Sequence, residues 1–320
     1  MLASVVLVRI HNQRGDDSGL HKSYKVIGYP TFVLASRTGE TLYRWWGYSK
    51  DEFMDEISKG LADPTTITEK QARYISNPDL KTAAALATYH FTRGDYKKSV
   101  DYYSDAAKYD PDYDYTYEIY SACRGGFRKE MYSKEEVKEA ADKALASEQV
   151  STYHKLRIYD QLAQAILLFK DDPDILTYIR EGYAYAGDKD EENIKYYKTR
   201  IKIAYTLYIE KDIPKAVNLK KNSFEAGWQD NAGNLNSFAW WCFENQINLE
   251  EAETLGRRGI KLAEPGRQRG NIMDTVAEIC NLRGDTEEAI ALMKNALKEV
   301  PDNEYYTKQL NKFRGFAQKE

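Results

Sequence analysis

The sequence predicts a short α+β segment, residues 1–63, followed by an all-α repeat array. Runs of apolar and β-branched residues typical of strands occur only in this first segment, and only helical periods follow. Two distant stretches of the helical part share one spacing of alanine, glycine and proline. With 320 residues, the chain is long enough for one domain and a repeat array.

Residues 1–63 are expected to form a strand, a helix, two strands and a helix, in that order. The run SVVLVRI, residues 4–10, is continuously apolar and β-branched, which favours a strand buried on both faces. A short helix is expected within residues 15–26. The strands TFVLAS and TLYRWWGY are joined by RTGE, whose Gly39 suits the left-handed position of a hairpin.

An amphipathic helix closes this segment. Phe53, Ile57 and Leu61 recur at every fourth residue, so they share one helical face. The helix is expected to stop at Asp63, because a proline follows it. Residues 64–78 are then predicted to be a linker.

The helical domain, residues 79–320, contains a repeated template centred on Gly94-Asp95 and Gly284-Asp285. Each glycine has an alanine seven residues before it, an alanine twelve residues after it and a proline seventeen residues after it. Small residues at fixed places let two helices approach closely, the Gly-Asp turn joins them, and proline ends the second helix. The spacing therefore predicts stacked helix pairs.

This template resembles the tetratricopeptide repeat. A third copy, residues 236–265, is followed by an expected three-residue insertion near PGRQRG, and a fourth, residues 202–227, is weaker. Only degenerate repeats are expected over residues 112–200. Turns are predicted there at Gly125-Gly126, Gly182 and Gly187.

With these elements in place, residues 1–63 resemble the C-terminal portion of a thioredoxin-fold domain. The full fold class is therefore a partial thioredoxin-like βαββα segment followed by an all-α, tetratricopeptide-like superhelical repeat array. The resemblance rests on VIGYPTFVL followed by GE and GY. Six residues fall in the family spacing: Val26, Gly28, Pro30, Thr31, Gly39 and Gly47.

The resemblance implies that the Tyr29–Pro30 peptide bond is cis. It also implies that this turn opens the backbone of Tyr29 to an extended peptide, with the loop around Gly47 completing the contact. Tyr29, Pro30 and Gly47 are therefore the peptide-binding candidates. No residue receives a catalytic, cofactor-binding or metal-binding role, and His11 and His21 are expected to be ordinary surface or strand-end residues.

The reactive motif of that family is missing, because the chain contains no Cys-x-x-Cys. In the family the motif follows a central strand, upstream of the strand that corresponds to residues 4–10. Two explanations stay open: a chain that begins late, or a degenerate domain whose strands pair directly and cap the repeat array. Cys123, Cys242 and Cys280 stand far apart and are expected to be packing residues.

The resemblance to helical repeats implies proteins or peptides as partners, and the composition argues against nucleic acid. A net charge of −4 and a pI near 5.8 give the whole chain no electrostatic footprint for nucleic acid. The chain has no apolar run long enough to span a membrane, and it lacks the motifs GxxxxGK[ST], GxSxG and HExxH. A cytoplasmic location is expected for the sequence as written, and export if an upstream signal has been lost.

Two functions are consistent with these features. The first is a non-catalytic protein-interaction scaffold with a redox-inactive thioredoxin-like remnant. The alternative is an N-terminally truncated thiol-disulfide oxidoreductase of a bacterial type in which the repeats recruit clients. An in-frame Cys-x-x-Cys upstream of the Met1 codon would favour the second.

Overall fold

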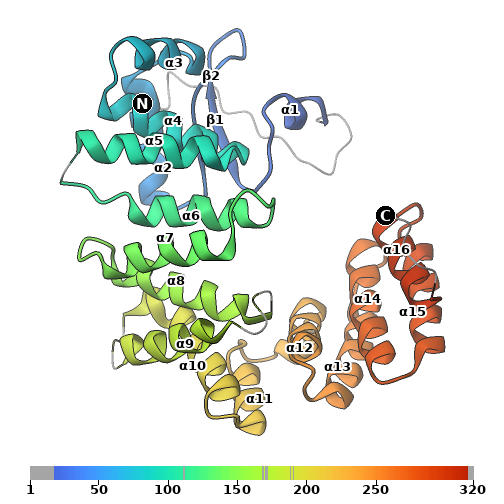
Figure 1. Cartoon of the computed structure of the whole chain (residues 1–320). Helices are drawn as coiled ribbons and strands as arrows, with labels where there is room; N and C mark the ends of the chain where they lie inside the picture. Colours follow the sequence, from blue (N-terminus) through green and yellow to red (C-terminus); the bar gives the residue numbers. More distant parts are fainter. Residues whose placement is uncertain are drawn as a thin grey trace. The chain divides into compact units, whose positions relative to one another are not determined.

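The computed structural model describes residues 18–315 except positions 111, 168, 170, 171, 188 and 190. The chain forms two compact units, which divide between Ile158 and Tyr159. Helices make up most of both units (Figure 1). The strand expected at residues 4–10 and the residue His11 lie outside the described residues.

Unit 1 contains the hairpin that the sequence predicts. The antiparallel strands are β1 (Thr31–Ala35) and β2 (Thr41–Trp46), and they form a two-stranded sheet among the described residues. Gly39 has φ of +85° in the connecting turn, the left-handed conformation expected there. Helix α1 (Ser18–Ser23) precedes the hairpin, and helix α2 (Lys50–Ala62) follows it.

The core of this α+β segment is an aromatic layer between the sheet and α2. Tyr43 and Trp45 of β2 and Ile57 of α2 are buried there, and Phe32 and Phe53 pack against them. The rings of Phe32 and Trp45 stack at 5.1 Å between centroids. The apolar face predicted for α2 is therefore the face that contacts the sheet.

The segment expected to be a linker, residues 64–78, contains a helix. This helix, α3 (Ile67–Ser76), begins with a capping box in which Thr66 and Glu69 each accept a hydrogen bond from the other's backbone N–H. It contacts β2 and the helix that follows it. The capping-box pattern is present in the sequence and is what starts a helix so soon after the preceding proline.

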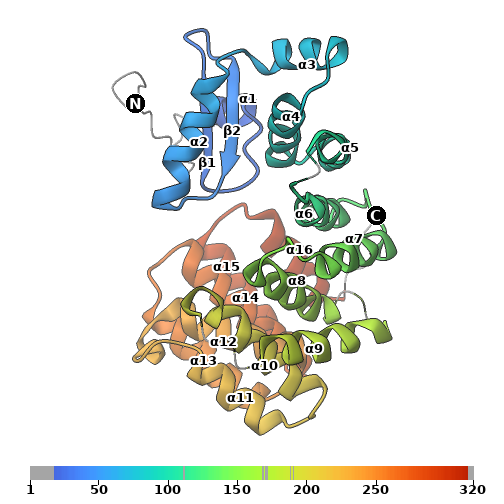
Figure 2. The same ribbon diagram turned by 90° about the vertical axis from the view of Figure 1, so that its left-hand side faces the viewer.

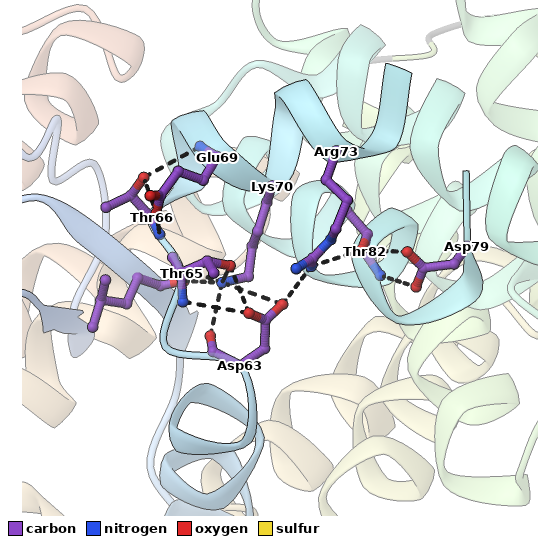
Figure 3. A network of polar contacts seen from close by, with 9 residues as sticks. Asp63, Thr65, Thr66, Glu69, Lys70, Arg73, Asp79 and Thr82 are labelled. Carbon is purple, nitrogen blue, oxygen red and sulfur yellow. Dashed lines mark hydrogen bonds and ion pairs between the residues drawn. The ribbon is translucent and has the colours of Figure 1, made fainter. Parts of the chain in front are cut away.

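A buried lysine joins these elements (Figure 3). Lys70 of α3 is 2% exposed, and its Nζ donates to three carbonyl oxygens: Leu42 at 3.2 Å, Asp63 at 2.9 Å and Thr65 at 2.5 Å. The Asp63 carboxylate lies 3.6 Å from the same ammonium and 2.5 Å from Arg73. The start of β2, the residue that follows α2 and two side chains of α3 therefore share one polar junction.

Helix pairs make up the rest of unit 1. Helix α4 (Leu80–Arg93) pairs with α5 (Tyr96–Tyr109), and Gly94 at φ of +77° caps the first of them. Helix α6 (Thr116–Phe127) pairs with α7 (Lys134–Ala146) and also packs on α5. The hairpin contacts α4 through β2, and Figure 2 shows α2 on the other side of the hairpin from α4. The α+β segment therefore covers the first helix of the array.

Unit 2 contains further helix pairs. Contacts join α10 to α11, α12 to α13, and α14 to α15, as the repeat copies predict. Helix α8 (Thr152–Gln164) spans the unit boundary. The elements after it are η3 (Ala165–Leu167), α9 (Pro173–Ala186), η4 (Glu192–Ile194), α10 (Lys195–Tyr208), α11 (Ile213–Asn222), η5 (Trp228–Asp230), α12 (Ala232–Asn245), α13 (Leu249–Leu262), α14 (Arg267–Leu282), α15 (Thr286–Glu299) and α16 (Glu304–Phe313).

Most of the glycines expected to mark turns in the middle of the chain lie inside helices. Residues 125–126 belong to α6 and Gly182 to α9, whereas Gly187 does follow the end of α9. A Cβ on Gly125 would stand 2.6 Å from the ring of Tyr96, and one on Gly182 would stand 2.7 Å from Tyr159. These glycines make room for tyrosine rings between helices, so the turn prediction was wrong for a packing reason.

The predicted three-residue insertion lengthens α14 at its N-terminus. Ala87 lies seven residues after the first residue of α4, whereas Ala277 lies ten residues after the first residue of α14. Arg269, in the added turn, donates to the carbonyl of Ala263 at 2.8 Å and pairs with Glu299 at 3.2 Å. The extra residues are thereby fixed against the ends of α13 and α15.

The junction predicts a specific stability effect. Lys70→Met removes the donor from one buried and two partly buried carbonyl groups, so local opening of β2 and α3 should become easier by about 2–4 kcal/mol. Native-state hydrogen exchange of the full chain measures this. Lys59→Met, at a side chain that is 62% exposed and paired with Glu56, is the matched control and should change little. Equal losses in the two variants would contradict the assigned role of Lys70.

Candidate functional site

The turn before β1 brings the three sequence-predicted site residues together. The Tyr29–Pro30 peptide bond is cis, as the resemblance implies. The carbonyl of Pro30 accepts a hydrogen bond from the backbone N–H of Gly47 at 3.1 Å. Gly47 has φ of +84°, and no atom lies within 4 Å of the place where a Cβ would stand. A backbone hydrogen bond therefore closes this end of the hairpin, while no described atom covers the outer side of Gly47.

Two exposed tyrosines flank this pair. Tyr29 is 64% exposed and Tyr48 is 65% exposed. The ring of Tyr48 lies 5.6 Å from that of Phe53, and Tyr29 lies 5.7 Å from His21. Tyr48 was not among the predicted site residues, although it directly follows the glycine that was. Exposed aromatic side chains beside an open backbone are typical of peptide contacts.

The hydrogen-bond pattern of the hairpin determines which backbone N–H and C=O groups of β1 point outward. Pro30 and Gly47 form a hydrogen-bonded pair, and such pairs alternate with pairs whose backbone groups point outward. Thr31 and Val33 belong to the second kind, opposite Trp46 and Arg44. Among the described residues no strand pairs with this edge. The N–H and C=O groups of Thr31 and Val33 can therefore pair with an extended segment.

A buried arginine holds the chain that leads into the turn. Arg44 is 1% exposed and donates to the carbonyls of Lys25 and Thr92 at 3.1 Å each, and also to that of Tyr24. Burial, together with the nearby charge of Arg93, lowers the pKa of the guanidinium to about 10. It therefore stays charged at neutral pH and ties the loop before Tyr29 to the last turn of α4.

The three cysteines are placed for packing. Cys123, Cys242 and Cys280 are all buried, and burial raises the pKa of their thiols to about 11, 12 and 11 respectively. A thiol acts as a nucleophile only as the thiolate. Within the described part of the chain, no cluster of His, Cys, Asp or Glu is arranged to hold a metal ion, and no helix is long and apolar enough to span a membrane.

Unit 2 carries a buried acidic pair. Asp274 and Glu278, one turn apart on α14, are each 6% exposed. Glu278 pairs with Lys312 of α16 at 2.6 Å, and Asp274 Oδ2 accepts from the hydroxyl of Tyr305 at 3.1 Å. Asp274 Oδ1 has no hydrogen-bond partner among the described residues. Burial, reinforced by the charge of Glu278, raises the pKa of Asp274 to about 6.

Comparisons with solved structures find chains that are weakly similar to this one. No protein-family model matches the chain, and no curated protein matches it. A chain of the crystal structure of the APC/C hetero-tetramer Cut9-Hcn1 is similar at a TM-score of 0.44 and 12% sequence identity. The match covers 77% of this chain and 45% of that one, so this chain spans less than half of its length. The helix pairs described above come from the present structure alone.

The buried acid predicts a pH dependence in unit 2. The folded pKa of Asp274 lies above its usual value of 3.8, so its contribution to stability is full below that value and is lost as the pH rises through about 6. Urea unfolding should show unit 2 more stable at pH 5 than at pH 7.5 by about 1–2 kcal/mol from this group. Asp274→Asn should remove that difference.

The exposed Asp302 of the same unit provides the control. Asp302→Asn makes the same charge change and should leave the pH dependence as it is. A wild-type pH dependence that persists unchanged in Asp274→Asn would show that another group is responsible.

Proposed function

We propose that the chain is a non-catalytic protein-interaction scaffold, built from tetratricopeptide-like repeats and a redox-inactive thioredoxin-like remnant. The observation that carries the proposal is the stacking of helix pairs in both units. Stacked helix pairs present extended surfaces to which segments of other proteins bind. The α+β segment adds two exposed tyrosines and a sheet edge with which no other strand pairs among the described residues.

Small residues where the paired helices touch support the repeat assignment. Ala87 and Ala106 of the first pair and Ala277 and Ala296 of the last pair are fully buried. Each lies where the shared template requires close approach of two helices. Larger side chains at these places would separate the helices by more than the Gly-Asp turn allows.

The hairpin that follows the Tyr29–Pro30 turn and the closing helix α2 support the thioredoxin-like origin of the first segment. In that role Tyr29, Pro30 and Gly47 form one wall of a peptide site. The same features favour the alternative, a thioredoxin-type oxidoreductase whose Cys-x-x-Cys half is encoded upstream. Reading the DNA before the Met1 codon separates the two: an in-frame Cys-x-x-Cys favours the enzyme, and a stop codon there excludes it.

The peptide wall predicts where an extended peptide protects the backbone. Peptides selected on the full chain from a random nonapeptide library should slow hydrogen exchange at residues 28–31 and 46–48. Tyr29→Ser and Tyr48→Ser should each weaken binding about three- to tenfold, because exposed aromatic side chains contribute strongly to such contacts. Tyr196→Ser in unit 2, at a tyrosine that is 63% exposed, should have no effect. Selected peptides that protect neither stretch would contradict this site.

The thiol environments predict no redox activity for this chain. In an insulin-reduction assay the chain should give no turnover above background, since burial keeps Cys123, Cys242 and Cys280 protonated at neutral pH. The reagent DTNB should label them only after denaturation. Measurable turnover that disappears in a Cys-to-Ala variant would overturn the non-catalytic proposal.

A further inference from the structure

A cavity of about 310 Å³ lies in unit 1, between the end of α5 and the start of α6. Asp110, Tyr113, Asp114 and Tyr115 line it, together with apolar side chains that include Ile119. Lysine, arginine and histidine are absent from its described lining. Its size is at the lower end of the range for ligand sites, so it fits one side chain or one small molecule.

Tyrosine rings form one wall of the cavity. The rings of Tyr113 and Tyr115 lie 4.5 Å apart at 56°, and Tyr115 stacks on Tyr103 at 5.8 Å. Tyr115 is buried, whereas Tyr113 is 49% exposed. The buried ring of Tyr115 thus lines the inner part of the cavity, and the half-exposed ring of Tyr113 lies at its opening. The faces of such rings attract cations.

The charges around the rings are negative. Asp114 Oδ1 accepts from the backbone N–H of Thr116 at 2.8 Å, and the hydroxyl of Tyr113 donates to Glu118 at 2.8 Å. Burial acts to raise the pKa of Asp114, but hydrogen bonds from Ser147 and Thr116 outweigh it and lower that pKa, so the carboxylate is ionised at neutral pH. Burial raises the pKa of Tyr115, and the carboxylates of Asp110 and Glu118 raise it further.

We propose that this cavity binds the cationic side chain, lysine or arginine, of a partner polypeptide. The proposal rests on the interaction function proposed above. Carboxylates of Asp110 and Asp114 would pair with the charged head, the tyrosine faces would stabilise it further, and Ile119 would contact the methylene stem. An anionic or purely apolar side chain would leave these carboxylates without a counter-charge.

An NMR titration of the full chain tests this, with the labelled isoleucine methyl group of Ile119 as the reporter. The probes are two nonapeptides that differ only at the centre, where one has lysine and the other norleucine, its uncharged near-isostere. The lysine peptide should bind at least about tenfold more tightly. Asp114→Asn keeps an acceptor for the N–H of Thr116, and it should weaken the lysine peptide about fivefold to tenfold.

Asp112→Asn is the matched control. Asp112 is exposed on the same loop, it does not line the cavity, and its loss changes the net charge by the same amount. It should leave binding nearly unchanged. An equal loss in this variant would reduce the effect to long-range charge and overturn the site. Circular-dichroism melts of both variants separate loss of binding from loss of folding.

Two further arms separate the ligands and the functions. Choline that competes with the lysine peptide at equal or lower concentration would identify a free organic cation as the ligand and contradict a side chain. Equal binding of the lysine and norleucine peptides would contradict the proposed cation-binding site but not the proposed scaffold function. Peptides that bind nowhere on the chain would contradict both.

Discussion

The buried ammonium of Lys70 is the interaction on which the architecture of unit 1 depends. A charged group this deeply buried is tolerated only when its donors are satisfied, since an isolated buried ammonium costs many kcal/mol. Its three carbonyl partners come from β2, from the end of α2 and from the connection that follows. The helix that carries the lysine must therefore form where those three backbone segments meet, which makes a linker-length stretch a structural part of the fold.

Arg44, between Tyr43 and Trp45 of β2, is a second buried cation whose terminal amino groups donate to backbone carbonyls. Its guanidinium is held by the carbonyls of Tyr24, Lys25 and Thr92. Because carbonyl oxygens are fixed by the backbone, such contacts define geometry more sharply than a pairing between two flexible side chains. These contacts fix the position of the Tyr29–Pro30 turn relative to the end of α4. A peptide bound at this turn would therefore contact a surface that the first helix pair holds in place.

The sequence alone predicts the parts of this structure that rest on local pattern. The hairpin with Gly39 and the apolar face of α2 follow from short-range spacing, and so do the helix pairs at both ends of the array. The cis bond before Pro30 was expected only from the resemblance to the thioredoxin fold. Helix α3 was not predicted, because Pro64 indicates the start of a linker. The capping box formed by Thr66 and Glu69 is nevertheless present in the sequence. The roles of Lys70 and Arg44 could not be predicted, because their partners lie up to 48 residues away and nothing periodic connects them.

The cavity between α5 and α6 could not be predicted from the sequence either. Asp110, Asp112 and Asp114 alternate along one connection and look alike in sequence, as residues that favour turns. In the structure two of them line a space floored by Tyr115, and the third faces solvent. The difference arises because the end of α5 and the start of α6 pack together and bring Tyr103 behind Tyr115. Stacking of helix pairs therefore does more than support this unit, since it also gives chemically identical neighbours different surroundings.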